Sequence, residues 1–494
     1  MCDGYGVFGG GSICQANPKS KLSVLSNSYS PNVMPGTAFN TDEQFHFEWY
    51  FCRTARKLSG AFQSPQSNAF IFQACIADRA VSHATIALCS VHRHAVLYHS
   101  QAHSQFPSTE ERFALVQYNK AIQCLPRNSE IRSPLSLRIA LFLASTLTVV
   151  ESLRGSYRTA KLHLKFGLRL LEQLRCISSE NEPSSGNGSQ VHTDEYFFRT
   201  FKRLYVQYAL LLEPRVSWAC NFLARPVSQL HRFGSTDEAR AQLEDILLDL
   251  RQLDLNDVLG RSVVQCSARG RFRKAIIKDL TAWKTTYDET MSAYNSTFER
   301  QKWFAYKLLH LYYTMASIMR QALQEDECIY DLMTPQFVSM LQQLLIIRDI
   351  ASRPQLRAKY FGPEDGLTHS IADMGVLCPL YFIAVKCRVP RIRLQAMALL
   401  DETPRHEYIW DSTLVVAIAR KVMQLEEGDA YDKVVANTDV CPTSVPDINK
   451  LDGPAIPLRQ RLRYVDIRLP DNTHDPVAIR YRRQSGKEAF LVVF

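Results

Sequence analysis

Apolar residues recur every three or four positions over much of this chain, a spacing that predicts amphipathic α-helices. The most regular stripe, residues 157–174, comprises Tyr157, Ala160, Leu164, Leu168, Leu170, Leu171 and Leu174. A second stripe, residues 243–253, follows Ser235 and Glu238, and a serine three residues before a glutamate can form a capping box at a helix start. A third stripe, residues 414–425, follows Asp411. These stripes predict three helices that each bury one face.

Two further segments are apolar on nearly every side. Residues 137–150 and 303–319 lack the polar face of a surface helix, which is typical of helices in the middle of a helical protein. The longest apolar run, residues 139–150, contains Ser145 and Thr148 and is well short of the ~20 residues that a membrane span needs. We therefore expect a large helical core and no membrane partner.

Three stretches interrupt the helical pattern and divide the chain. Residues 1–41 are rich in Gly, Ser, Asn and Pro and are predicted to form a flexible leader, and residues 178–193 are predicted to form an exposed loop. The prolines of residues 441–457 separate a tail, residues 458–494, in which apolar and polar positions alternate. We expect an all-α fold, with a helical domain over residues 42–440 and a small C-terminal β-hairpin or two short strands.

The composition fits a large packed protein. Of the 494 residues 46% are apolar and 22% are charged, which leaves room for about two to four domains or one large helical domain. The net charge of +9 is spread thinly over the chain and does not demand a nucleic-acid partner. Thirteen cysteines without a C-x-x-C pair exclude a disulfide framework and a complete zinc site. Since the first residues also lack a signal-peptide pattern, we expect a reducing compartment.

One nucleotide-binding pattern is present but lacks its context. Residues 4–9 match G-x-G-x-x-G, yet only three residues precede them and no acidic residue follows at the ~20-residue distance of a ribose-binding carboxylate. A phosphate-binding loop, a G-x-S-x-G elbow and an H-E-x-x-H helix are all absent from the sequence. The sequence therefore predicts no catalytic or cofactor-binding residue and indicates a protein that is not an enzyme.

A cluster of histidines is the one place where a metal site or an active site is worth considering. Its members are His83, His92, His94, His99 and His103. On a helix, His99 and His103 would share one face, but a metal needs a third and a fourth ligand. The nearest carboxylates, Asp78 and Glu110, are not on an obvious shared face. We favour exposed or hydrogen-bonded histidines and predict no metal ligand.

Two groups of arginines raise the question of phosphate contacts. Residues 269–274 (RGRFRK) resemble a nuclear-import or phosphate-binding patch, although a solvated helix face is the interpretation we favour. The tail carries Arg459, Arg461, Arg463, Arg468, Arg480, Arg482 and Arg483, with Asp466, Asp471 and Asp475 between them. This interleaving favours local ion pairs over a nucleic-acid track.

Five segments, in order along the chain, resemble the helical regulatory domain of fungal transcription factors that bind DNA through a two-zinc, six-cysteine cluster. The segments are residues 51–62 (FCRTARKLSGAF), 80–92 (AVSHATIALCSVH), 118–122 (YNKAI), 155–171 (GSYRTAKLHLKFGLRLL) and 384–412, which contains AVKCRVPRIR, AMALL and WDS. The resemblance extends from about residue 47 to residue 427. It implies an all-α regulatory domain in which these positions serve packing and none is catalytic.

The first residues resemble the end of that family's zinc cluster. The cluster precedes the regulatory domain, and a short Asp-Gly-Tyr-Gly run often follows its last cysteine. Residues 2–6 read CDGYG, so Cys2 looks like the sixth cysteine of a cluster whose other five this chain lacks. One thiolate cannot hold two zinc ions, because each needs about four ligands. Either the start lies further upstream, which we favour, or the cluster has been lost and the helical domain acts alone.

The resemblance implies a nuclear transcription regulator of metabolic or secondary-metabolite biosynthesis genes. Its expected partners are the transcription machinery or co-regulator proteins, with promoter DNA and zinc only where the upstream cluster exists. The alternative is a module that binds proteins or a small-molecule effector and does not contact DNA. Homodimer formation stays open, because no sustained heptad marks a coiled coil.

Overall fold

The computed structural model describes residues 39–62, 65–97, 108–125, 133–180, 188–211, 231–258, 266–293, 300–323, 326–356, 371–402, 405–428, 443–451, 456–470, 475–483 and 488–492. Helices dominate these residues, and the strands form only small antiparallel sheets. The predicted all-α fold is therefore confirmed. The predicted leader falls almost wholly on residues 1–38, which lie outside the described residues.

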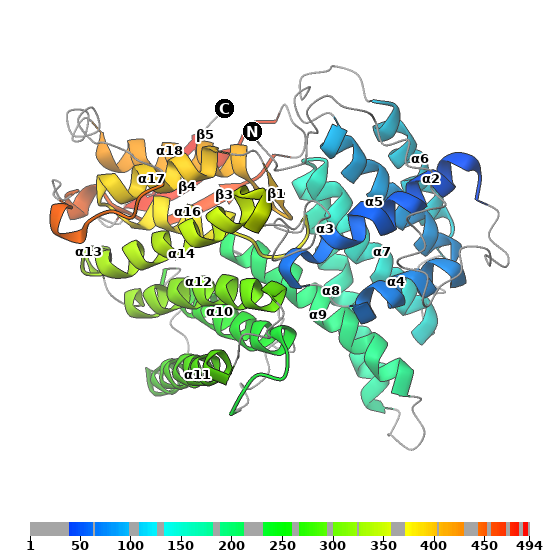
Figure 1. Cartoon of the computed structure of the whole chain (residues 1–494), viewed down its shortest axis with the longest axis horizontal. Helices are drawn as coiled ribbons and strands as arrows, with labels where there is room; N and C mark the ends of the chain where they lie inside the picture. Colours follow the sequence, from blue (N-terminus) through cyan, green and yellow to red (C-terminus); the bar gives the residue numbers. More distant parts are fainter. Residues whose placement is uncertain are drawn as a thin grey trace.

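Figure 1 shows the helices in two groups, with α9 running between them. The first group and α9 comprise α2 (Thr41–Trp49), the π-helix η2 (Tyr50–Thr54), α3 (Ala55–Ser59), the 3-10 turn η3 (Gly60–Phe62), α4 (Pro65–Ala77), α5 (Arg79–Leu97), α6 (Thr109–Gln123), α7 (Pro134–Leu153), α8 (Tyr157–Glu180) and α9 (Gly188–Leu211). The second group comprises α10 (Thr236–Val258), α11 (Cys266–Ala293), α12 (Arg300–Ala322), α13 (Ile329–Leu332), α14 (Thr334–Ser352), α16 (Leu377–Lys386), α17 (Pro390–Asp401) and α18 (Ser412–Glu427). The C-terminal strands pack beside this second group (Figure 1).

The all-round apolar segments form central helices, as predicted. Helix α7 begins at Ser133, whose hydroxyl accepts a hydrogen bond from the Ser136 amide at 3.1 Å, and Pro134 occupies its first turn. The hydroxyl of Thr148, which is fully buried, donates to the Ala144 carbonyl at 2.6 Å. Polar side chains can therefore be tolerated inside α7, because the helix itself supplies their partners.

Length alone does not distinguish α7 from a membrane-spanning helix. Among the described helices it alone is long and apolar enough to cross a membrane, since its 20 residues extend beyond the run at residues 139–150. However, 83% of its apolar window is buried inside the protein. The helix that the sequence placed in the core is therefore longer than its apolar run suggested, and its environment here is protein.

Both predicted helix starts have a side-chain cap, but the capping box expected at Ser235 is only half formed. The Ser235 hydroxyl accepts from the Glu238 amide at 3.1 Å, but the Glu238 carboxylate accepts from the Gly234 amide at 2.8 Å rather than from Ser235. At the start of α18, the Asp411 carboxylate accepts from the Leu414 amide at 2.8 Å. Side-chain acceptors thus satisfy amide groups that have no partner within the first turn of each helix.

The predicted loop at residues 178–193 is shorter than expected. Helix α8 continues through Glu180 and α9 begins at Gly188. Serines and other polar residues at both ends of the predicted loop are therefore helical. Their helix propensity is only modestly unfavourable, and this does not end a helix that tertiary packing stabilises.

The tail contains three strands where the sequence indicated two. Strands β3 (Leu462–Arg468), β4 (Ala478–Arg483) and β5 (Glu488–Val492) form an antiparallel sheet in the order β3-β4-β5. The third strand was missed because its five residues lack a clear alternation of apolar and polar positions. A second, two-stranded sheet, β1 (His406–Glu407) and β2 (Trp410–Asp411), precedes α18 and turns through Tyr408, whose φ is 57°.

Candidate ligand cavity and buried ion pairs

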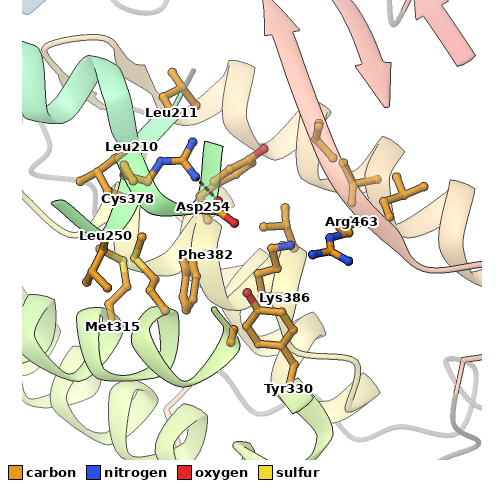
Figure 2. A pocket seen from close by; sticks show the side chains of 18 of the residues that line it. Leu210, Leu211, Leu250, Asp254, Met315, Tyr330, Cys378, Phe382, Lys386 and Arg463 are labelled. Carbon is orange, nitrogen blue, oxygen red and sulfur yellow. Dashed lines mark hydrogen bonds and ion pairs between the residues drawn. The ribbon is translucent and has the colours of Figure 1, made fainter. Parts of the chain in front are cut away.

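A cavity of about 120 Å³ lies where α9, α10, α12 and α16 meet β3. Figure 2 shows the side chains of several of these elements converging on it. Its apolar walls include Leu210, Leu250, Met315, Phe382, Leu462 and Val465. The cavity thus joins the helical body to the C-terminal sheet, and no motif in the sequence indicated it.

Charged side chains that line the cavity are paired on two of its sides. Arg251 Nη1 lies 2.9 Å from Asp254 Oδ2, and Figure 2 marks this contact. Lys386 Nζ lies 3.0 Å from Glu327 Oε1. Burial alone would lower the pKa of Lys386, but the Glu327 carboxylate outweighs that effect and raises this pKa, so Lys386 stays charged.

Two donors in the cavity wall differ from these pairs. Arg463 makes no hydrogen bond or ion pair with any residue that the structure describes. It occupies the β3 position where the register with β4 shifts, between Leu462 and Tyr464. The Trp410 indole is 1% exposed, and its Nε1 has no hydrogen-bond partner among the described residues. A buried N–H without a partner is rare in folded proteins. The Nε1 atom of Trp410 is enclosed by protein, however, so of these two Arg463 is the donor that is open to the cavity.

The basic residues of the segment at 384–393 form a chain of buried ion pairs. Glu327 binds both Lys386 and Arg388, the latter at 2.7 Å. Arg388 also binds Glu426 at 2.7 Å, and Glu426 is fully buried. The spacing that resembled a family motif therefore places cations around acidic residues from two distant parts of the chain.

Glu426 is the centre of this chain. One oxygen accepts from Arg388 and from the Leu462 amide, at 2.7 and 2.9 Å, and the other lies 2.5 Å from Arg393 Nη2. Burial would raise the pKa of Glu426, but the two guanidinium groups outweigh it and lower this pKa to about 2. Glu426 thereby ties α17 and α18 to the first residue of β3.

The other resembling segments meet one another inside the first helical group. Thr54 Oγ1 lies 3.0 Å from His92 Nδ1, which joins the segments at 51–62 and 80–92. The Tyr118 hydroxyl lies 2.7 Å from His163 Nε2, which joins the segments at 118–122 and 155–171. These positions serve packing and internal hydrogen bonding.

The predicted histidine cluster does not assemble into a metal site in the part of the chain that is described. Each described histidine bonds to a neighbouring side chain, His83 to Gln117, His92 to Thr54 and His94 to Ser108, at 2.6, 3.0 and 2.9 Å. Burial lowers the pKa of His92 to about 3, helped by the charges of Lys57 and Arg53. His99 and His103 lie outside the described residues. No group of three or more His, Cys, Asp or Glu within the described residues could hold a metal ion.

The basic run at residues 269–274 lies in α11. Arg271 and Lys274 are exposed, whereas Arg273 Nη2 donates to the Leu323 carbonyl at 2.9 Å. The side chain of Arg269 is outside the described part. This arrangement resembles the solvated helix face that we favoured.

The tail arginines range from buried to exposed: Arg461 is buried, Arg459 and Arg468 are exposed, and the others are half-buried. Arg480 pairs with Asp466 at 3.2 Å, which confirms local pairing at that position. Arg461, 2% exposed, and Arg483 instead bond to backbone carbonyls of the body, and Arg461 also binds Asp331 at 2.7 Å. Asp471, Cys2 and the G-x-G-x-x-G run all lie outside the described residues.

Comparison with known proteins gives one distant relative. Over 203 residues the chain is 28% identical to the Aspercryptin biosynthesis cluster-specific transcription regulator atnN of Emericella nidulans. The match covers 36% of this chain and 31% of that regulator, so the chain spans about a third of the relative's length. No family model matches the chain, and no solved structure matches it.

Proposed function

We propose that this chain regulates transcription in the nucleus through its helical domain, as a member of the fungal zinc-cluster family. The observation that carries the proposal is its similarity to a cluster-specific transcription regulator. The five ordered segments support it, because four of them are joined in pairs by side-chain hydrogen bonds and the fifth forms the ion-pair chain. By the same similarity, the proposed targets are genes of secondary metabolism.

Sequence-specific DNA contact is assigned in this proposal to a zinc cluster in which Cys2 is the last cysteine. Cys2 alone cannot hold the two zinc ions, so five further cysteines would have to precede it. Mapping the 5′ end of the transcript and translating the upstream genomic sequence tests this assignment. Five cysteines joined in frame to Cys2 would support it. A transcript that starts just before Met1 would contradict it and would leave a protein-interaction module.

The regulatory role itself is tested by tethering. The full chain is fused to a heterologous DNA-binding domain, and a reporter gene with the matching site is measured in a fungal host. We expect reporter output to differ from that of the DNA-binding domain alone, and to return to that level when Phe201→Ala damages the core. Unchanged output from a fusion that is shown to accumulate in the nucleus would contradict the proposal.

A further inference from the structure

The cavity between the helices and β3 contains a positive charge that nothing in the described residues neutralises. Its lining holds three cations and two carboxylates, and Asp254 and Glu327 are each already paired with a cation. Glu327 is in addition shared with Arg388. The remaining cation is Arg463, whose guanidinium group Figure 2 shows turned toward the cavity on the side of Lys386.

The backbone explains how Arg463 reaches this position. In a regular strand, successive side chains point to opposite faces of the sheet. Between Leu462 and Tyr464 the pairing with β4 skips one residue, so Arg463 is the extra residue of a β-bulge. Bulges redirect a side chain and are frequent next to binding sites. Leu462, Arg463 and Val465 all line the same cavity as a result.

The rest of the lining matches the other parts of a small organic anion. Leucine, methionine and phenylalanine side chains provide apolar surface in the lining, and Figure 2 shows Leu210, Leu250 and Met315 on the far side of the cavity from Arg463. Burial raises the pKa of Tyr330, another lining residue, to about 12, so its hydroxyl remains a neutral donor. These lining residues therefore provide one cation without a partner among the described residues, one neutral hydroxyl donor and apolar side chains.

We propose that this cavity binds a small apolar carboxylate, with Arg463 as the group that pairs with its negative charge. A guanidinium group matches the two oxygens of a carboxylate in a bidentate arrangement. The volume of about 120 Å³ sets the scale of the apolar body. A cavity of roughly 150 Å³ takes one benzene ring, so the apolar body in this smaller cavity is at most a single ring or a short branched chain.

The proposed ligand would connect two parts of the fold. It would contact β3 through Arg463 and the helical body through Phe382 and Leu250. The β3 strand is held to that body at the adjacent Leu462 amide by Glu426. Occupancy would therefore stabilise the docking of the C-terminal sheet. A role for the bound ligand as a signal to the transcription machinery rests on the proposed function. The proposal that the cavity binds the ligand does not depend on that function.

Calorimetric titration of the purified full chain with benzoate tests the proposal. We expect saturable binding of benzoate and much weaker binding of benzyl alcohol, which has a similar shape but no charge. The variant Arg463→Gln should weaken benzoate binding about tenfold or more, because it removes a charge-assisted hydrogen bond. The control Arg468→Gln changes an exposed arginine at the other end of β3, and binding should be unchanged.

Three results would overturn the proposal. One is the absence of saturable binding for benzoate and for 4-methylpentanoate. Another is equal loss of affinity in Arg463→Gln and Arg468→Gln. The third is equal affinity of the native chain for benzoate and benzyl alcohol, a comparison that does not depend on any variant folding correctly. A chain that binds benzoate but fails the tethering assay would contradict only the regulatory function.

Discussion

Gly167 on α8 lies directly against the ring of Phe201 on α9. A Cβ atom at Gly167 would overlap the Cε1 and Cζ atoms of Phe201 and would approach Ala144 Cβ to 3.2 Å. Phe201 is fully buried and so has no open side to move into. Gly167, the second glycine of the segment at 155–171, is thus required by the close contact of two helices.

Gly167→Ala is expected to lower the free energy of unfolding by about 1–3 kcal/mol, the usual cost of overpacking a core. Urea denaturation followed by circular dichroism measures this difference. Adding Phe201→Leu should restore part of the lost stability, because the smaller side chain makes room for the new methyl group.

Gly270 on α11 provides the matched control. A Cβ atom there would meet nothing within 4 Å. Gly270→Ala should therefore raise stability by up to ~1 kcal/mol through helix propensity alone. If both alanine variants were equally well tolerated, the contact between Gly167 and Phe201 would not limit the packing of α8 on α9.

A second prediction concerns the carboxylate at the centre of the ion-pair chain. Glu426→Gln leaves the buried guanidinium groups of Arg388 and Arg393 without a full counter-charge. Breaking a buried pair in this way is expected to lower the free energy of unfolding by about 3–5 kcal/mol. Glu172→Gln, at an exposed position on α8, is the control and should change stability by less than about 0.5 kcal/mol.

The pH dependence of Glu426 has a definite sign. Its pKa is lowered from an ordinary 4.5 to about 2, so its stabilising contribution is complete above pH 4.5 and is lost as the pH falls toward 2. The difference in stability between the native chain and Glu426→Gln should shrink over that interval. A constant difference between pH 5 and pH 3 would contradict the assignment of this carboxylate as charged in the folded state.

The helices could be predicted because apolar spacing and helix caps depend on residues that are close together in the sequence. The stripe that begins at Tyr157 and the cap at Asp411 each depend on residues within a few turns of one another. The ion-pair chain could not be predicted in the same way. Glu327 and Glu426 lie 59 and 38 residues from the cations they bind, Lys386 and Arg388, and only the fold brings them together.

The cavity illustrates the same limit. The tail arginines were visible in the sequence, and their interleaving with aspartates indicated local pairs. That prediction holds for Arg480. It misses Arg461, which is buried in the body, and Arg463, which a bulge turns into the cavity. A one-residue shift in strand pairing decides where Arg463 points. This shift cannot be predicted from the types of residue in the tail.

A third prediction uses the buried histidine that joins two helical segments. The pKa of His92 is lowered by burial from 6.5 to about 3, so the folded chain holds it neutral. Below pH 6.5 the unfolded chain gains a proton that the folded chain does not, and stability falls by about 1.4 kcal/mol per pH unit from this residue. His92→Asn should remove that part of the slope between pH 6 and pH 5.

The control for this measurement is Gln173→Asn, at an exposed position on α8. This variant removes no titratable group, so the slope of stability against pH should match that of the native chain. If the curves of unfolding free energy against pH were parallel for the native chain and His92→Asn, then His92 would be protonated as readily in the folded state as in the unfolded state.

The last prediction concerns the attachment of the C-terminal sheet. Arg461 precedes β3, is 2% exposed, and donates to the carbonyls of Ile456 and Glu327 and to the Asp331 carboxylate at 2.8, 2.9 and 2.7 Å. Arg461→Gln cannot replace three charge-assisted contacts, so we expect a loss of about 2 kcal/mol or more. Hydrogen exchange of β3 and β4 amides should accelerate more than that of α7 amides, because the sheet would separate from the body before the helical core unfolds.

Arg459→Gln, at an exposed position two residues earlier, should leave both rates unchanged. If exchange in the sheet were the same in both variants, Arg461 would not hold the sheet on the body, and the contacts of Glu426 and Arg483 would remain as those that do.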